Sequence, residues 1–279
     1  MSGFTALYAK QMYRFVRSPM EMMSTLFMPL ILVGLFGVGM ASALGRVAGG
    51  LAGGATVGGL AGAGMTSGGA GAGFGAAYLA FMTPGAAALT VLSSSVVGGA
   101  TLLQERLNGV IRQYLVAPIP RLAILAGSVS SSVTKAVGQA VLIVLLAAVL
   151  GAHMQLQGPA TLAAMAGTLA FAIGFAGLSA YFASITSTMG AYHAVINIFN
   201  VPLLFASNAL YPLSVLPGWL RALALLNPTS YAVELVRLAT GAGAPELLGV
   251  AGDLAVLAGF GAAGLMVGLK GVRLWATPL

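Results

Sequence analysis

Residues 104–121 read QERLNGVIRQYLVAPIPR, and this stretch decides the fold. It holds four charged side chains, although only 6% of the 279 residues are Asp, Glu, Lys or Arg, far below the roughly 25% of globular domains. Residues 47–104 and 136–220 carry no such charge. A charged segment between long apolar runs is typical of a loop that emerges from a lipid bilayer.

The rest of the composition fits that interpretation. The chain is 59% hydrophobic with a mean hydropathy of +0.99. A spanning helix needs roughly 20 mostly apolar residues, which leaves room for about six. The apolar runs are continuous and do not alternate at period two, which favours helices over a barrel. We therefore predict an all-α integral membrane protein with a single transmembrane domain over residues 1–279 and no soluble domain.

Six spans are predicted from the apolar runs. They cover residues 22–44, 83–103, 136–151 (extended back to 128), 161–184, 194–210 and 248–269. Residues 45–75 are rich in glycine. Small residues at spacing four can pack membrane helices closely, but so much glycine weakens a helix. We favour a flexible external loop there over a packed segment.

An amphipathic helix is predicted over residues 4–18. One face carries Lys10, Arg14 and Arg17, and the other carries Phe4, Tyr8, Met12, Phe15 and Val16. This pattern is typical of a helix that lies flat on a membrane surface.

The basic residues indicate the orientation. Six spans put both termini on one side of the membrane. With the termini inside, the cytoplasmic cations are Lys10, Arg14, Arg17, Arg106, Arg112, Arg121, Lys270 and Arg273, and the external ones are Arg46, Arg221 and Arg237. Lys135 is expected near the inner end of the third span. The positive-inside rule thus explains the net charge of +7 without a nucleic-acid partner.

Within the charged segment, apolar residues recur at helical spacing. They are Leu107, Val110, Ile111, Tyr114 and Leu115, with Arg106 and Arg112 between them and Pro118 and Pro120 after them. The spacing predicts a short amphipathic helix tied to two spans, which suits a lever moved by a partner. The alternative is an ordinary cytoplasmic loop that obeys the positive-inside rule.

Two motifs add a resemblance. Residues 78–125 contain Tyr78, Phe81, Pro84-Gly85, Glu105-Arg106, Gly109, Pro118 and Arg121, and residues 208–241 contain Tyr211-Pro212, Leu216-Pro217, Trp219, Asn227-Pro228 and Arg237. In order and spacing they resemble the membrane subunits of type-2 ATP-binding-cassette (ABC) exporters, most of all the bacterial drug-resistance and lipid-export branch.

The resemblance implies roles for three segments. Residues 1–20, with Lys10, Arg14 and Arg17, correspond to an interfacial helix. Residues 104–121 correspond to a coupling helix that docks on a separate ATPase subunit, through Glu105, Arg106, Gly109, Arg112, Pro118 and Arg121. Residues 211–237 correspond to external re-entrant helices, with Tyr211, Pro212, Trp219, Glu234 and Arg237 at an outer gate.

The resemblance also implies the setting. The expected protein is a permease, not an enzyme, in the bacterial plasma (inner) membrane, with both termini cytoplasmic. It pairs with a second permease copy, identical or paralogous, and with ATPase subunits that bind ATP and magnesium. The expected cargo is hydrophobic or amphipathic, such as a drug or a lipid.

No catalytic, nucleotide or metal site is predicted. The chain has no Gly-Lys pair for a phosphate-binding loop and no cysteine. The string GFGAAG at 259–264 lies within a predicted span, where helix packing explains it better than dinucleotide binding. His153 and His193 fall on opposite membrane sides and are expected to be structural or solvated. A membrane-embedded enzyme is therefore the weakest interpretation.

A self-sufficient, ion-coupled transporter or channel is the main alternative. It would need an acidic residue at mid-membrane. The five carboxylates all fall near span ends or in loops: Glu21, Glu105, Glu234, Glu246 and Asp253. Glu234 and Arg237 stand at i, i+3 and either pair with each other or gate the exit. Polar residues of the fifth span are the predicted substrate path, namely Asn197, Asn200, Ser207 and Asn208.

Overall fold

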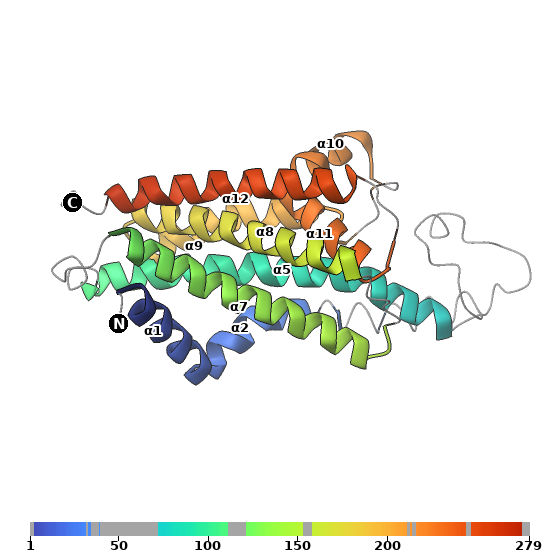
Figure 1. Ribbon diagram of the computed structural model, residues 1–279, viewed down its shortest axis with the longest axis horizontal. Coiled ribbons are helices and arrows are strands. Elements are labelled where there is room, and N and C mark those ends of the chain that lie inside the picture. The colour runs from blue at the N-terminus through green and yellow to red at the C-terminus, as the bar shows by residue number, and fades with distance from the viewer. Residues whose placement is uncertain are drawn as a thin grey trace, which may run out of the picture.

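The computed structural model describes residues 3–31, 33–34, 39, 72–110, 121–152, 158–210, 213, 216–243 and 247–274. Within these ranges every regular element is a helix, and no strand is present. The helices are α1 Gly3–Arg17, α2 Pro19–Ile31, α5 Ala72–Leu107, α7 Arg121–Val149, α8 Gly158–Ile185, α9 Met189–Phe205, α10 Gly218–Leu226, α11 Pro228–Ala239 and α12 Gly249–Leu274. The longest of them run side by side along the long axis of the molecule (Figure 1).

The part of the chain that the structure describes agrees with the predicted all-α membrane class. Within it, four helices are long and apolar enough to cross a membrane: Leu79–Leu107, Leu122–Val149, Gly158–Ile185 and Gly249–Gly271. The count of six spans stays a prediction. Helix α2 is described only to Ile31, and α9, with 17 residues, is an apolar helix shorter than the four spans above. The glycine-rich segment 45–75 lies outside the described residues, except that 72–75 begin α5.

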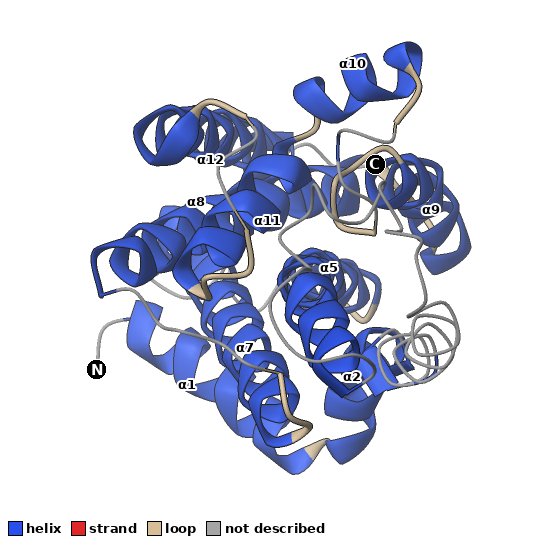
Figure 2. Cartoon of the chain, turned by 90° about the vertical axis from the view of Figure 1, so that its right-hand side faces the viewer, coloured by secondary structure: helices blue, strands red, loops and turns tan. Residues whose placement is uncertain are grey.

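Helix α5 lies at the centre of the bundle. It contacts α2, α7, α8, α9 and α11, and the view along the long axis shows the other helices around it (Figure 2). Of its most apolar stretch 72% is buried, against 22% for α12. The hydroxyl groups of its side chains donate to backbone carbonyls of the same helix. Thr83 Oγ1, for example, donates to Leu79 O at 2.6 Å, just before Pro84. The central helix can therefore carry polar residues without leaving them unpaired in lipid.

Helix α7 begins earlier than the sequence indicated. It starts at Arg121, whereas the third span was expected over 136–151 with an extension back to 128. The reason is a covering helix: Lys135 is 8% exposed, and its Nζ lies 4.9 Å from the ring centroid of Phe15 in α1. Because α1 covers the charge, the helix continues through it.

Helices α8 and α12 touch backbone to backbone. An added Cβ at Gly264 would meet the carbonyl oxygen of Gly174, and one at Gly177 would meet that of Gly264. A Cβ at Gly261 would lie 2.8 Å from Ala170 O. This confirms that GFGAAG serves close helix packing, in which small residues let two backbones approach.

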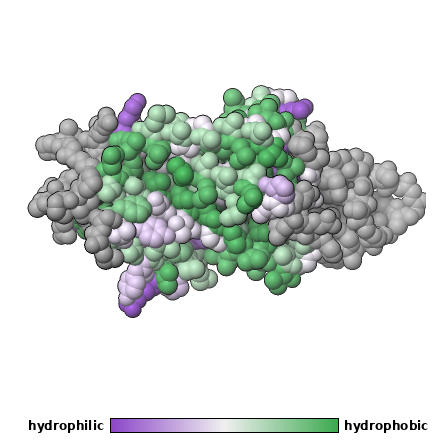
Figure 3. Space-filling model, in the orientation of Figure 1, coloured by the Kyte–Doolittle hydropathy of each residue, from purple (hydrophilic) through white to green (hydrophobic). Residues whose placement is uncertain are grey.

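Large apolar side chains cover much of the outer surface. Val149, Leu162, Ile198 and Leu226 are each at least 70% exposed. The face in Figure 3 is mainly hydrophobic along the middle of the described residues, with hydrophilic side chains gathered toward the ends. An exposed apolar surface of this kind is expected where a protein contacts lipid.

Candidate functional site

The end of α5 is fastened to the N-terminal helix. Lys10 Nζ lies 3.0 Å from Glu105 Oε1, and Arg14 donates to Gln104 Oε1 at 3.4 Å. The Glu105 carboxylate is nearly buried, with a side-chain exposure of 7%, against 46% for Lys10. A shielded ion pair of this kind is screened less by salt than a surface pair. The structure thus turns Glu105 toward its own chain.

Arg106 fastens the same end of α5 to α8. Its Nη1 donates to the carbonyls of Ala183, Ser184 and Thr186 at 3.3, 2.7 and 3.3 Å. These three carbonyls lie in the last turn of α8 and just beyond it. Carbonyls at a helix C-terminus have no hydrogen-bond partner within the helix. A cation there also complements the negative end of the helix dipole. One arginine therefore joins two helix ends.

Gly109 ends this junction with a turn. Its φ is +74°, and its N–H donates to Arg106 O at 3.1 Å. Glycine adopts this left-handed conformation without the steric cost of a Cβ, as at many helix C-termini. The Glu-Arg-x-x-Gly spacing thus has a local reason: two anchoring side chains, then a reversal of the chain.

The remaining predicted residues of the charged segment are placed only in part. Arg112 and Pro118 lie outside the described residues, and Arg121 is the first residue of α7, with its side chain not described. The predicted bounds 104–121 therefore overlap the end of α5 and the start of α7. A role of all six residues in docking an ATPase stays a prediction.

Helix α1 lies against α7 by a face that matches the expected one in part: Phe15 is buried, and Phe4, Tyr8 and Met12 are half-buried. Leu7, Gln11 and Phe15 are buried, whereas Val16, expected on the apolar face, is 71% exposed. Ser131 Oγ donates to Gln11 Oε1, and Tyr8 Oη donates to Thr134 Oγ1 at 3.2 Å. The contact with α7 is polar as well as apolar, so it overrides the simple division that hydropathy predicts.

Asn227 organises the opposite end of the bundle. Its Nδ2 donates to Leu203 O at 2.8 Å and to Ala206 O at 2.9 Å, and its Oδ1 accepts from the N–H of Thr229 at 2.9 Å. The side chain thus caps the start of α11 and the end of α9 together. Pro228, at the first position of α11, needs no hydrogen-bond partner there.

The two sequence motifs meet at this end. Arg237 is 3% exposed, donates to Asn208 O at 3.0 Å, and its Cζ lies 4.4 Å above the ring of Phe81. A Cβ on Gly85 would collide with the Ala209 carbonyl. The Pro-Gly of the first motif therefore permits the close approach that the second motif requires. Of the other residues predicted at the outer gate, Trp219 is 68% exposed on α10, and Tyr211 and Pro212 lie outside the described residues.

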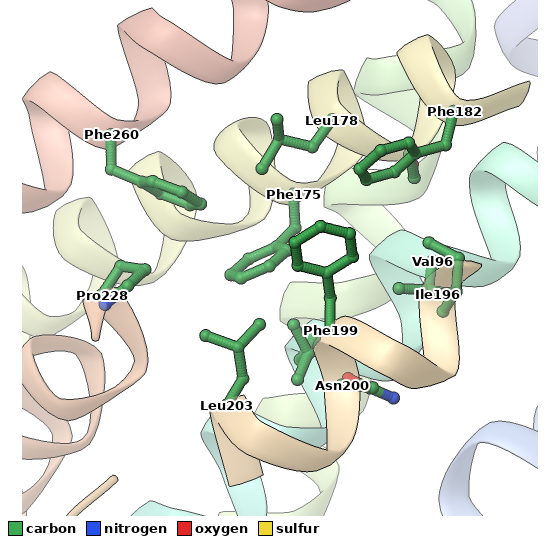
Figure 4. Close-up of a pocket in the computed structure, with 12 residues that line it drawn as sticks. Val96, Phe175, Leu178, Phe182, Ile196, Phe199, Asn200, Leu203, Pro228 and Phe260 are labelled. Carbon is green, nitrogen blue, oxygen red and sulfur yellow. The ribbon is translucent and has the colours of Figure 1, made fainter. Parts of the chain in front are cut away.

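The predicted substrate-path residues separate into two groups. Ser207 and Asn208 are fully buried in the turn after α9, whereas Asn197 is exposed. Asn200 lies on the wall of a cavity of about 220 Å³ and of a second one of about 190 Å³. Figure 4 shows the first cavity, where Phe175, Phe182 and Phe199 surround an apolar space next to the Asn200 amide.

The structure contains a buried pair of carboxylates that the sequence did not predict. Glu234 in α11 and Asp253 in α12 are 1% and 0% exposed. Glu234 Oε1 accepts from the N–H of Leu247 at 3.1 Å, and Asp253 Oδ1 accepts from that of Leu248 at 3.4 Å. Their positions near helix ends were predicted, but not their burial or contact, because nothing in the spacing signals it.

The family of the chain follows from its sequence relatives. Residues 2–240 match the ABC-2 type transporter family, and the chain belongs to that family. A transport permease named ycf38 from Cyanophora paradoxa is 31% identical over 161 residues, 57% of this chain and 55% of that protein. The daunorubicin resistance ABC transporter permease protein DrrB1 of Streptomyces coeruleorubidus is 28% identical over 160 residues, 57% of this chain and 56% of that protein. The chain thus spans about half the length of the relatives it matches.

Family and fold agree on the coarse assignment. Several apolar helices in a member of this family indicate a multi-pass membrane protein of the ABC-2 type transporter family.

Proposed function

We propose that this chain forms the membrane path of an ATP-driven exporter, with residues 104–121 as the handle moved by a separate ATPase subunit. The observation that carries the proposal is the double anchorage at the end of α5: Glu105 to α1 and Arg106 to α8. A force on the adjoining residues reaches three helices at once. Six spans, cytoplasmic termini, a bacterial inner membrane and a second permease copy complete the proposal.

The proposed cargo is a hydrophobic or amphipathic molecule such as a drug or a lipid. The cavity of about 220 Å³ is almost wholly apolar, with the Asn200 amide at its edge. A second, more open groove of about 390 Å³ shares Phe199, Leu203 and Pro228 with it. The two cavities that Asn200 lines, of about 220 and 190 Å³, are smaller than the roughly 300–1,000 Å³ of drug-sized ligand sites. This supports a path completed by a second copy.

The coupling role is tested in vesicles that contain the chain and its ATPase subunit. We expect Arg106→Gln to lower the amount of a fluorescent lipophilic amine exported per ATP hydrolysed by about tenfold, since the handle is then detached from α8. Arg221→Gln, on the exposed surface of α10, is the matched control and should leave the ratio unchanged.

Two outcomes would contradict the proposal. Unchanged complex formation together with unchanged transport in Glu105→Ala and Arg106→Ala would refute the coupling role. Transport that proceeds without the ATPase subunit or ATP would favour the ion-coupled alternative.

A further inference from the structure

The junction between α11 and α12 holds two acidic side chains that face the same short segment. Leu247 and Leu248 are consecutive, and their amides donate to Glu234 Oε1 and Asp253 Oδ1. Consecutive backbone nitrogens are less than about 3.8 Å apart. The side chain of Glu234 is also a direct interaction partner of Asp253, so the two carboxyl groups are neighbours. One belongs to α11 and the other to α12, which means that they bridge two helices.

The second oxygen of each group is left over. Glu234 Oε2 and Asp253 Oδ2 are both fully buried, and neither has a hydrogen-bond partner among the described residues. A buried carboxylate oxygen without a donor is costly, and two adjacent negative charges in an apolar setting add repulsion to that cost. Both penalties disappear if one proton lies between these two oxygens.

We propose that Glu234 and Asp253 form a proton-binding site, in which one shared proton joins α11 to the start of α12. This inference does not rest on the proposed function. The pair then carries one negative charge, which the amides of Leu247 and Leu248 and the positive end of the α12 dipole stabilise. Asp253 lies in the second turn of α12, close to that end.

The surrounding groups are consistent with a single site. Tyr231 of α11 lies within electrostatic range of both carboxylates: its burial raises the pKa of the hydroxyl, and the charges of Asp253 and Glu234 raise it further. Its hydroxyl donates instead to Leu225 O at 2.6 Å. Arg237 lies one turn along α11 and bonds to Asn208 O, and Glu246 lies outside the described residues. The adjacent part of α8 carries no charged side chain.

Infrared spectroscopy of the full chain in lipid nanodiscs tests the site directly. At neutral pH we expect the C=O band of a protonated carboxyl, shifted in D₂O and lost on raising the pH. Glu234→Gln and Asp253→Asn should each abolish it, because the new amide donates to the remaining carboxylate in place of the proton. Glu105→Gln is the matched control, since its carboxylate pairs with Lys10 and should leave the band unchanged.

A stability measurement gives an independent readout. A proton bound by the folded chain and not by the unfolded chain stabilises the fold at low pH, and this stabilisation declines as the pH rises through the titration of the pair. We expect the melting temperature of the wild type to fall with rising pH in that range. The single variants should show a flatter profile, provided that they elute as the wild type does on size exclusion.

Three results would overturn the inference. The first is the absence of a protonated-carboxyl band in the wild type at neutral pH. The second is a band that persists in either single variant. The third is a band that sodium, potassium, calcium or magnesium removes at constant pH, which would identify a metal-cation site instead.

Discussion

Single residues hold together the end of the bundle where α9 meets α11, and Asn227 makes three hydrogen bonds there. Asparagine is the side chain that both accepts from a helix N-terminus and donates to free carbonyls. The Asn-Pro pair recognised in the sequence therefore has two separate reasons: Asn227 satisfies two helix ends, and Pro228 begins α11.

Removing this side chain should destabilise the chain. We expect Asn227→Ala to lower the free energy of unfolding by about 2–4 kcal/mol, because it loses a cap and leaves buried carbonyls unpaired. Asn227→Asp keeps the acceptor but places a buried carboxylate oxygen against the carbonyls of Leu203 and Ala206, so it should cost at least as much. Thermal unfolding in detergent checks this, and Asn197→Ala, on the exposed face of α9, should change little. An equal loss in both alanine variants would contradict the assigned bonds.

Asn200 is a second residue whose role can be tested by substitution. Its Oδ1 is buried and has no hydrogen-bond partner among the described residues, and it adjoins two cavities. We expect Asn200→Leu to raise the KM for export of an amphipathic amine about tenfold, since a polar group of the cargo loses its partner. Asn197→Leu is the control on the same helix. Equal KM values in the two variants would remove Asn200 from the path.

The packing of α8 on α12 depends on glycine at the points where the two backbones touch. Gly264 has no room for a methyl group, whereas Gly259, on the same helix, has open space around its Cα. The two positions therefore form a matched pair for one substitution.

Alanine should have opposite effects at these positions. We expect Gly264→Ala to destabilise the chain by about 1–3 kcal/mol through overpacking. Gly259→Ala should be neutral or stabilise by up to about 1 kcal/mol, the gain of alanine over glycine in a helix. Melting temperatures in one detergent measure both. A stabilising Gly264→Ala would show that the two helices do not touch as described.

The bounds of α8 were predicted well from the sequence, whereas the start of α7 was not. The fourth span, expected over 161–184, is α8 at Gly158–Ile185, because polar and glycine-rich turns mark both of its ends. The third span was placed too late, since Lys135 was taken as a boundary and its cover, Phe15, is remote in sequence. Hydropathy detects a charge but not the partner that shields it.

The candidate site was predictable to the same extent. Glu105, Arg106 and Gly109 were singled out in the sequence as part of a coupling helix over 104–121, a role that stays a prediction. The structure places Glu105 and Arg106 in the last turn of α5 and Gly109 just after it. Their contacts with Lys10 and with the end of α8 were not predictable, nor was the pairing of Glu234 with Asp253. Each of these contacts joins segments that only the folded bundle brings together.

For the whole molecule, the proposed topology separates the two ends of the bundle across the membrane. Asn108 and Gly218 are both exposed; Asn108 follows the last residue of α5, and Gly218 is the first residue of α10. The end of α5 and helix α10 lie toward opposite ends of the bundle (Figure 1). The natural chain has no cysteine, so a single introduced thiol is the only one present.

Labelling of single thiols checks the orientation. We expect an impermeant maleimide to label Gly218→Cys in intact cells, and to label Asn108→Cys only after the membrane is opened. Labelling of Asn108→Cys in intact cells would place the charged segment outside and end the proposal that an ATPase moves it. Equal labelling after solubilisation shows that both thiols are accessible.

The backbone contact between α8 and α12 has a mechanical consequence. The two backbones touch at Gly174, Gly177 and Gly264, and the rings of Phe171, Phe175 and Phe260 pack beside these contacts. We therefore expect the two helices to move as one unit about 39 Å long, the length of the 26 residues of α12. Arg106 binds the C-terminal end of α8, and the acidic pair lies at the other end of the two helices, near the start of α12. We expect a tilt imposed at the Arg106 end of α8 to be carried along α12 to the end that holds the acidic pair.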